Sequence, residues 1–518
     1  MLLSVPWVLS FIVGFLSLSE EILWVRMAGF VYETLPPAFS FVLACYLVGI
    51  AAGAAFGRRL CARFRNLYAA AAVVLSVAAL FDVLIPLISG RLIRADGSHL
   101  YIPALAIVVT AGLKSALFPI VHHLGSTQGS RLGRSMSRIY FGNIVGATLG
   151  PLVTGFVGLD YLNVDECFGV AAAISLLAAV VCVLKSGKPL LILETLAAAV
   201  IASVAAAKFI APGPGSLIAY AKGGAASITH FVSNRYGLIH TALTDQGEMV
   251  FGGNVYDGIV TTNVDSNPNR LDRLYLVALL HPKPKRILFI GLSTGAWVAA
   301  ALGLGNADTI DVVEINPGYL ELIRSHPQVS KIFKDRRVHI HIDDGRRWLK
   351  RNPDAQYDLI VQNTTYYWRA NSANLLSREY FEESRTHLLP GGIFAVNSTG
   401  SFDVLATMQS VFDFSYLYFN FVYASDQPLT PDPLRLLEIH RPDGKVFSFD
   451  GSAPGSVAAS LRSVRLESTR SFLARLNAGA EIITDDNMLT EYKHGRRFGP
   501  AFLQRLLPRE AANFGGVH

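Results

Sequence analysis

The sequence predicts a multi-span α-helical membrane domain followed by an α/β domain that begins with a small β-sheet. Three observations lead to this prediction. Residues 1–212 contain only 14 Lys and Arg and 9 Asp and Glu, whereas residues 213–518 contain 31 and 30. Long apolar runs fill the first part, and in the second part short apolar runs alternate with helical patterns. We therefore expect three domains, over residues 1–212, 213–262 and 263–518.

The composition argues against two kinds of function for the C-terminal part. The whole chain is 16% charged, below the ~25% of average soluble proteins, but the deficit lies in residues 1–212. Basic and acidic residues nearly cancel in residues 213–518, so a basic nucleic-acid-binding surface is disfavoured. All four cysteines precede residue 213, which excludes an internal disulfide framework and a thiolate zinc site in the second part.

The N-terminal part contains seven segments long enough to cross a bilayer as helices, which takes about 20 apolar residues. They lie near residues 7–30, 38–57, 68–89, 101–122, 139–159, 166–184 and 189–210. Asp82 weakens the third segment and Glu194 the seventh. Basic loop residues such as Arg58 and Arg131 place the N-terminus in the cytoplasm. Seven crossings would put the C-terminal half outside. Either one weak segment does not span, which we favour because the ligand inferred for that half is cytosolic, or the active site faces out.

Three ionisable side chains lie inside the predicted spans: Glu20, Glu21 and Lys114. A charge at that depth costs at least about 2.5–3.5 kcal/mol, so it needs an explanation. One interpretation is a structural ion pair of a glutamate with Arg26 or Lys114 that holds the helices together. The other is a path for a substrate or a proton.

Turn residues separate short apolar runs over residues 228–262, which is the pattern of a small antiparallel sheet. Strands and helices then alternate, as is typical of a parallel α/β sheet. We expect strands at residues 286–290, 309–313, 338–342, 358–362 and 393–397, and helices at residues 296–304 and 377–389.

The ends of the predicted strands carry residues that suit a nucleoside. The first strand runs into Gly291-Leu292-Ser293-Thr294-Gly295, where glycines let backbone N–H groups approach a ligand. The second ends in Glu314, 23 residues after Gly291, a position from which an acid holds ribose hydroxyls. The third ends in Asp343-Asp344-Gly345, whose acids can accept a hydrogen bond from an adenine amino group.

These strand ends favour a Rossmann-like domain that binds an adenosylmethionine-type ligand rather than NAD. The dinucleotide fingerprint Gly-x-Gly-x-x-Gly is missing, because residues 293 and 296 are Ser and Ala. A sulfonium nucleoside has no pyrophosphate and does not need the third glycine. The candidate cofactor-binding residues are Gly291, Ser293, Gly295, Glu314, Asp343, Asp344 and Gly345.

Several motifs, in order, resemble the spermidine synthase (polyamine aminopropyltransferase) family over roughly residues 228–400. They are His281-Pro282-Lys283-Pro284-Lys285-Arg286, Gly291-Leu292-Ser293-Thr294-Gly295, Val313-Glu314-Ile315-Asn316, Asp335-Arg336-Arg337-Val338, Asp343-Asp344-Gly345-Arg346 and Tyr357-Asp358-Leu359-Ile360. The first span, with Glu20-Glu21-Ile22-Leu23-Trp24-Val25-Arg26, and the late Thr484-Asp485-Asp486-Asn487 are similar to a bacterial subgroup in which a multi-span membrane domain is fused ahead of this fold. The resemblance implies decarboxylated S-adenosylmethionine as the co-substrate and transfer of its aminopropyl group to a diamine.

Two segments depart from the family. Its catalytic aspartate after Tyr-Asp-x-Ile falls on Asn363, which has no charge to attract and deprotonate an ammonium, and the second acid of that loop falls near Tyr366. The diamine-binding Tyr-His-Glu of the family falls on Asn269-Arg270-Leu271, with Asp272 as the only acid nearby. The cofactor half of the site therefore resembles the family, and the amine half is rebuilt.

The candidate catalytic residues are Asn363, Asp485 and Asp486. The two aspartates either replace the lost acids or begin a helix. The loop 363–369 forms either a lid over the acceptor or an aromatic cluster that packs on the membrane domain. His339 and His341 share one face of a strand without a third ligand in view, so we expect no metal. The candidate substrate-binding residues are Tyr256, Asp257, Asp272, Tyr366, Tyr367 and Trp368.

We expect a multi-pass inner-membrane transferase, its soluble half cytoplasmic, that binds decarboxylated S-adenosylmethionine or S-adenosylmethionine. It would pass an aminopropyl or other alkyl group to a small-molecule amine or a membrane-associated acceptor. One alternative, favoured by Asn363, is an S-adenosylmethionine-dependent methyltransferase acting on a membrane-delivered acceptor. The other, favoured by Glu20, Glu21 and Lys114, is a non-enzymatic transporter or sensor of a polyamine or nucleoside. The expected partners include the lipid bilayer and no nucleic acid, and a homodimer is left open.

Overall fold

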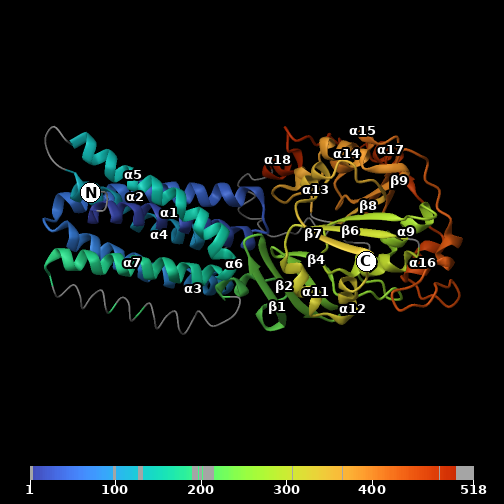
Figure 1. Ribbon diagram of the computed structural model, residues 1–518, viewed down its shortest axis with the longest axis horizontal. Helices are drawn as coiled ribbons and strands as arrows, with labels where there is room; N and C mark the ends of the chain where they lie inside the picture. Colours follow the sequence, from blue (N-terminus) through green and yellow to red (C-terminus); the bar gives the residue numbers. More distant parts are fainter. Residues whose placement is uncertain are drawn as a thin grey trace. The chain divides into compact units, whose positions relative to one another are not determined.

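The computed structural model describes residues 4–96, 101–126, 132–188, 197, 201, 215–305, 307–363, 366–477 and 479–496. The chain forms two compact units. One is Met1–Ala226 with Phe231–Leu238, and the other is Ser227–His230 with Ile239–His518. The first unit is helical, and the second is built around a large mixed sheet (Figure 1).

Six helices of the described residues are long and apolar enough to cross a membrane, and they coincide with the first six predicted segments. The seventh predicted segment, 189–210, lies outside the described residues apart from residues 197 and 201. The fifth helix continues past Pro151 through a π-helical turn, Thr154–Gly158, and a short helix α6, Leu159–Tyr161. The six helices are α1 (Val5–Val31), α2 (Pro36–Arg63), α3 (Leu67–Asp96), α4 (Tyr101–Gly125), α5 (Leu132–Val153) and α7 (Val164–Ser186).

Glycines spaced four residues apart let pairs of these helices approach closely. Gly49, Gly53 and Gly57 of α2 face the backbone of α4, and a Cβ added at Gly53 would lie 2.1 Å from the Gly112 carbonyl oxygen. On α5, Gly146 faces α1 in the same way, with 2.0 Å between the added Cβ and the Phe11 carbonyl oxygen. Small residues at this spacing are typical of helix pairs in membranes, where close backbone packing replaces hydrophobic burial.

One buried ionic cluster joins three helices. Lys114 Nζ of α4 lies 2.8 Å from Glu20 Oε1 of α1 and also binds Asp82 of α3. All three side chains are at most 1% exposed. The structure therefore contains an ion pair of a glutamate with Lys114, as the structural interpretation predicted, and Asp82 is its third member. Arg26 instead donates a hydrogen bond to the Asn234 carbonyl.

A small antiparallel sheet opens the second half of the chain. Its strands follow one another in the order β1-β2-β3-β4, as meandering hairpins do. Their bounds are β1 (Ile228–Asn234), β2 (Gly237–Thr244), β3 (Gly247–Gly252) and β4 (Val255–Ile259). The turns fall at Asn234–Gly237, Thr244–Gly247 and Gly252–Val255, where the sequence carries Gly, Asn and Asp.

The large sheet has eight strands in the order β12-β10-β11-β9-β8-β5-β6-β7. The five strands from β9 to β7 are parallel, and β10, β11 and β12 extend the sheet in antiparallel pairing. Each predicted strand is present, with its ends within one residue of the prediction except for β9, which begins at Leu388 instead of residue 393. The bounds are β5 (Arg286–Ile290), β6 (Thr309–Glu314), β7 (Val338–Ile342), β8 (Tyr357–Gln362), β9 (Leu388–Asn397), β10 (Phe414–Tyr418), β11 (Phe421–Ser425) and β12 (Glu467–Ser468).

Helices cover both faces of this sheet. Figure 1 shows α13, α14 and α15 on one side and α11 and α12 on the other, as right-handed crossovers require when the strand order reverses next to β5. The core under α13, α14 and α15 includes Leu288, Tyr357, Phe381 and Phe394. The helix bounds are α9 (Asp272–Leu280), α10 (Ala296–Ala301), α11 (Gly318–Arg324), α12 (Pro327–Ser330), α13 (Gly345–Arg351), α14 (Arg378–Thr386), α15 (Phe402–Val411), α16 (Val457–Arg462), α17 (Thr469–Leu476) and α18 (Leu489–Arg496).

Two predicted helices end earlier than expected. The helix predicted at 296–304 becomes α10 followed by a 3₁₀ turn at Leu302–Leu304. The helix predicted to end at residue 389 stops at Thr386, and the Leu389-Pro390-Gly391-Gly392 segment lies within β9. Tyr357 pairs with Leu388 and Leu359 with Ile393, so this segment bulges out of the strand, which Gly391 permits with a φ of 76°.

Candidate active site

The carboxyl ends of β5, β6 and β7 carry the predicted nucleoside-binding residues along one edge of the sheet. The loop after β5 is tightly curved, with φ of 93° at Gly291, 49° at Ser293 and 72° at Gly295. Glycine adopts such angles at no cost, and Ser293 is an exception that local contacts hold in place. A Cβ at Gly295 would lie 3.0 Å from Ile323 Cδ1 of α11, so this position admits only glycine without rearrangement.

Glu314 at the end of β6 faces the glycine loop. Its Oε2 accepts a hydrogen bond from the Leu292 N–H and its Oε1 from the Asn316 N–H, both at 2.8 Å. The side chain is buried. Burial raises the pKa of Glu314, and the backbone N–H groups of the two turns partly offset that effect. The backbone N–H groups of Ser293 and Ile315 act on the same carboxylate.

Asp257 of β4 lies next to the same loop. Tyr319 of α11 donates its hydroxyl hydrogen to Asp257 Oδ2, and the Ser293 hydroxyl donates to the Asp257 carbonyl. Burial raises the pKa of Asp257 to about 7; the Tyr319 hydrogen bond lowers it and the negative charge of Glu314 raises it further. A carboxyl group with this pKa exchanges a proton near neutral pH, as a general base must.

The acids at the end of β7 are held by the helix that follows. Asp344 caps α13 by accepting a 2.8 Å hydrogen bond from the Arg347 N–H. Asp343 binds the side chains of Arg347 and Arg351. Burial alone would raise the pKa of Asp343, but these arginines and the Asp344 N–H outweigh it and lower the pKa. Gly345 is needed for packing, because an added Cβ would lie 2.6 Å from Ile290 Cγ2.

Asn363 follows β8 and belongs to a network of side-chain amides. Asn397 Nδ2 donates to Asn363 Oδ1 at 2.8 Å, and Asn420 Nδ2 donates to Asn397 Oδ1 at 2.9 Å. In the aromatic loop, residues 364 and 365 lie outside the description, and the rings of Tyr366 and Trp368 are 5.4 Å apart. The Tyr367 N–H donates to Thr399 Oγ1 at 3.1 Å.

Electrostatic interactions connect the aromatic loop with β4. The positive charge of Arg369 acts on Asp257 and Tyr319, and Tyr366 acts on Tyr256. Burial is the main cause that raises the pKa of Tyr256. The loop therefore lies near Asp257, as a lid over an acceptor would.

Arginine side chains lie in the part of the site that corresponds to the diamine-binding residues of the family, where the sequence departs from the family. Asp272 is fully buried and accepts hydrogen bonds from Asn267 Nδ2 and from the Tyr418 hydroxyl at 2.9 Å. Arg270 Nε lies 3.5 Å from Asp272, and the Arg270 guanidinium stacks 4.4 Å from the centre of the Phe419 ring. Burial and the nearby Arg270 lower the pKa of Arg273. Asp272 thus sits inside the fold between two arginines.

Asp485 and Asp486 lie in different environments. Asp485 receives two hydrogen bonds from the Arg346 guanidinium, at 2.7 and 2.6 Å, and one from the Ser377 hydroxyl at 2.7 Å. Arg346 and Ser377 lower the pKa of Asp485. Asp486 is exposed. The catalytic roles predicted for these residues and for Asn363 stay predictions.

Sequence reasoning missed two contributors. The first is Tyr319, which contacts Asp257 from α11 and which no local motif marks. The second is a cluster of His230, Glu248 and His326, whose ligand atoms all lie within 4.8 Å of one another. His339 and His341, the two histidines on one face of β7, do not belong to this cluster. His341 lies 3.2 Å from Asp311 and stacks on Trp348, and His339 is exposed.

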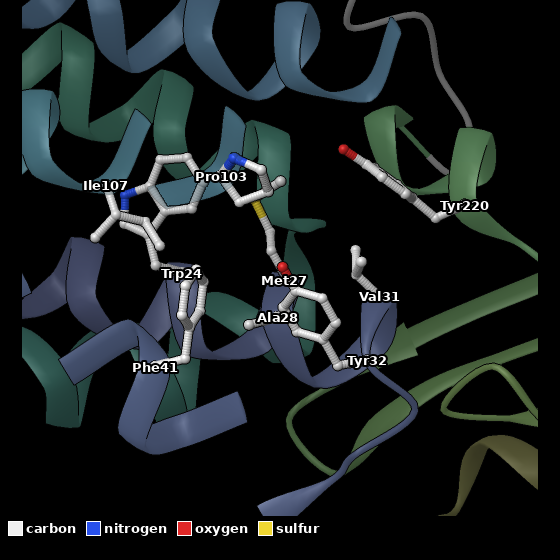
Figure 2. A pocket seen from close by; sticks show the side chains of 9 residues that line it. All are labelled: Trp24, Met27, Ala28, Val31, Tyr32, Phe41, Pro103, Ile107 and Tyr220. Carbon is white, nitrogen blue, oxygen red and sulfur yellow. The ribbon is translucent and has the colours of Figure 1, made fainter. Parts of the chain in front are cut away.

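The helical unit has a small pocket of its own. Figure 2 shows Trp24 and Met27 of α1 and Tyr32, directly after that helix, pointing into it, with Ile107 of α4 and Tyr220 on the other sides. Its volume of about 20 Å³ is enough for roughly one water molecule. The pocket is therefore too small for an amine substrate in this conformation.

Comparisons with known proteins point to one family. Residues 274–424 match the spermine/spermidine synthase domain. The polyamine aminopropyltransferase of Prochlorococcus marinus (strain MIT 9215) is 28% identical over 167 residues, which cover 29% of this chain and 58% of that protein. Spermidine synthase 1 of Hyoscyamus niger is 27% identical over 161 residues, covering 30% and 51%.

The chain spans about half the length of the curated relatives it matches. Among solved structures, the spermidine synthase from Thermotoga maritima is 16% identical and aligns with a TM-score of 0.37, covering 48% of this chain and 88% of that one.

Proposed function

We propose that this protein, of which residues 274–424 match the spermine/spermidine synthase domain, is a membrane-integrated alkyltransferase. It binds decarboxylated S-adenosylmethionine at the edge formed by β5, β6 and β7. It transfers the aminopropyl group to an amine. The six apolar helices support a place in the bacterial inner membrane, where the acceptor is either dissolved or delivered by the bilayer.

The observation that carries this proposal is the orientation of Glu314. Backbone N–H groups on two sides fix both carboxylate oxygens beside the glycine loop. A carboxylate fixed in this place suits the two adjacent hydroxyls of a ribose, which a carboxylate binds in pairs. The curvature at Gly291 and Gly295 exposes backbone N–H groups to the same ligand.

Asp257 suits the proton transfer that the reaction needs. The amine lone pair attacks the carbon next to the sulfonium, the carbon–sulfur bond breaks, and its electron pair stays on sulfur as a neutral thioether. The nitrogen then carries one proton too many, and a carboxylate with a pKa of about 7 accepts it near neutral pH. Most of the acceleration comes from holding amine and sulfonium in line.

A second candidate is methyl transfer from S-adenosylmethionine itself, which the positive charge on the acceptor side of the site favours. Arg270 and Arg273 lie around Asp272, and Arg369 acts on Asp257. Arginines bind a carboxylate well and repel a diamine. The α-carboxylate of S-adenosylmethionine, which the decarboxylated form lacks, is a suitable partner for them, and methyl transfer is then the reaction.

One experiment separates these reactions. Purified protein in detergent is given either nucleoside with a panel of amines, and the thioether product is identified by mass spectrometry. Aminopropyl transfer leaves methylthioadenosine, whereas methyl transfer leaves the homocysteine-bearing thioether. We expect methylthioadenosine from the decarboxylated nucleoside alone. Product from neither nucleoside, with binding intact, would contradict both reactions and favour a non-enzymatic sensor or transporter.

A further inference from the structure

Three side chains with metal-binding atoms converge outside the candidate active site. His230 is on β1, Glu248 on β3, and His326 directly precedes α12, all in the second compact unit. His326 Nε2 lies 2.7 Å from Glu248 Oε2, and His230 Nδ1 lies 3.2 Å from Glu248 Oε1. Ligand atoms of a tetrahedral zinc site are about 3.3 Å apart, given bonds of about 2.0 Å, so a small movement suffices to admit an ion.

The hydrogen bonds of His326 orient the ring as in many metal sites. His326 Nδ1 lies 2.7 Å from the Leu322 carbonyl oxygen, which only accepts, so Nδ1 carries the hydrogen. In a neutral ring Nε2 then has a lone pair, and that lone pair faces the Glu248 carboxylate. Two electron-rich groups meet in this way when a cation lies between them, either a metal ion or a second proton on the ring. A backbone carbonyl on the far nitrogen is the usual support of a metal-bound histidine.

Glu248 is supported in the same manner. Thr229 and Thr241 both donate their hydroxyl hydrogens to Glu248 Oε1, the second at 2.7 Å, which fixes the carboxylate while its other oxygen faces His326. The exposure of the three side chains falls from 42% for His230 to 17% for Glu248 and 9% for His326. The cluster is thus anchored inside the fold and open to solvent on the His230 side.

We propose that His230, Glu248 and His326 bind a zinc ion, with a water molecule as the fourth ligand on the exposed side. Two imidazoles and one carboxylate match zinc and its late first-row neighbours, whereas magnesium and calcium take oxygen ligands. The ion fastens the small sheet to the turn after α11. Tyr319 on that helix holds Asp257 of β4, so the zinc site and the candidate active site stabilise the same contact between sheet and helix.

The test uses the full chain in detergent, with any purification tag removed and metal stripped by a chelator. Titration calorimetry with zinc is expected to give one site per chain. Cobalt(II) is expected to bind there with the absorption of a tetrahedral complex. Saturating zinc, at about 100 times its Kd, is expected to raise Tm by about 5–10 °C.

Two variants remove one ligand each: His230→Ala, at an exposed position, and Glu248→Gln, which keeps an acceptor for the threonines. Changing residues behind a ligand already costs 10–100-fold in affinity, so each variant is expected to lose at least about 100-fold. His339→Ala and Glu321→Gln, both exposed elsewhere in the same unit, are expected to bind zinc like the wild type. Absence of zinc binding by the wild type, or unchanged affinity in both ligand variants, would overturn the proposal and leave a doubly protonated His326 as the cation. The readouts are metal affinity and Tm, so the outcome does not depend on the transferase activity.

Discussion

Two carboxyl groups, the buried Glu314 and the half-buried Asp257, carry the proposed chemistry of the candidate active site at the scale of single residues. The place of Glu314 at the end of β6 was predictable, because the apolar strand and the glycine turn 23 residues earlier mark that strand end in the sequence. The setting of Asp257 was not. Its hydrogen bond to Tyr319 joins residues 62 positions apart, and local sequence carries no signal for such a pair.

Asp257→Asn tests the proposed base. In the wild type, kcat/KM is expected to rise with pH and level off above an apparent pKa of about 7, because only the deprotonated carboxyl accepts a proton. The variant is expected to lose about 10²–10⁴-fold in rate and this pH dependence with it. A pH profile of product formation decides the matter. Retention of the wild-type profile by the variant would assign the base to another group.

The free energy of unfolding of the wild type is expected to depend on the protonation of the same carboxyl group. Because the folded protein raises the pKa of Asp257 above the ordinary 3.8, the fold favours the protonated form. The contribution of Asp257 is therefore fully present below pH 3.8 and is lost as the pH rises through about 7. Denaturation of Asp257→Asn is expected to lack this part of the pH dependence.

Tyr319→Phe tests the partner of that carboxyl group. The Tyr319 hydroxyl lowers the pKa of Asp257, because it stabilises the charged form. Without it, the rise of kcat/KM is expected to move to higher pH by about one unit, while the plateau rate stays close to wild type. A profile that moves to lower pH would contradict this account of the hydrogen bond.

At the scale of elements, the strands of the large sheet were predicted closely and the helix ends less well. Continuous apolar runs such as Arg286–Ile290 mark buried parallel strands. The helix predicted at residues 377–389 stops at Thr386, because the Leu389-Pro390-Gly391-Gly392 segment joins β9 in its pairing with β8 and forms a bulge there. The close helix pairs were not predicted, because the apolar length of a segment does not show which helix it packs against.

Gly53→Ala tests the packing of α2 on α4. The added Cβ would meet the Gly112 carbonyl oxygen at 2.1 Å, and overpacking of this kind costs about 1–3 kcal/mol. Gly29→Ala is the matched control, because nothing lies within 4 Å of its added Cβ. Thermal unfolding in detergent is expected to show a lower Tm for Gly53→Ala and none of this loss for Gly29→Ala. Equal Tm values would show that α2 and α4 do not pack this closely.

At the scale of the whole molecule, the two-part organisation follows from the distribution of charge along the chain. Six of the predicted apolar segments are long helices in the structure, and six crossings would return the chain to its starting side. Intramembrane charges were recognised as a feature needing explanation, and Lys114 was named as a partner. The place of Asp82 was not foreseen, because helices far apart in sequence bring it to Lys114.

Lys114→Met tests whether this ionic cluster is structural. Removing the lysine leaves Glu20 and Asp82 buried without a counter-charge, which is expected to destabilise the helical unit by about 3–5 kcal/mol. Replacing all three with apolar residues of similar size is expected to restore stability within about 1 kcal/mol, since an apolar core needs no ion pair. The free energy of unfolding of the helical unit, determined in detergent, provides the measurement. If the triple variant is as stable as wild type but inactive, the cluster has a functional role in addition.

Calorimetric binding of decarboxylated S-adenosylmethionine to wild type and Glu314→Gln tests the central claim most directly, that Glu314 and the strand ends hold an adenosyl sulfonium nucleoside. Two bonds to a charged acceptor contribute about 1.5–3 kcal/mol each, so the variant is expected to bind at least about 100-fold more weakly. Glu321→Gln, exposed on α11, serves as the control and is expected to bind like the wild type. Unchanged affinity in a folded Glu314→Gln protein would contradict the account.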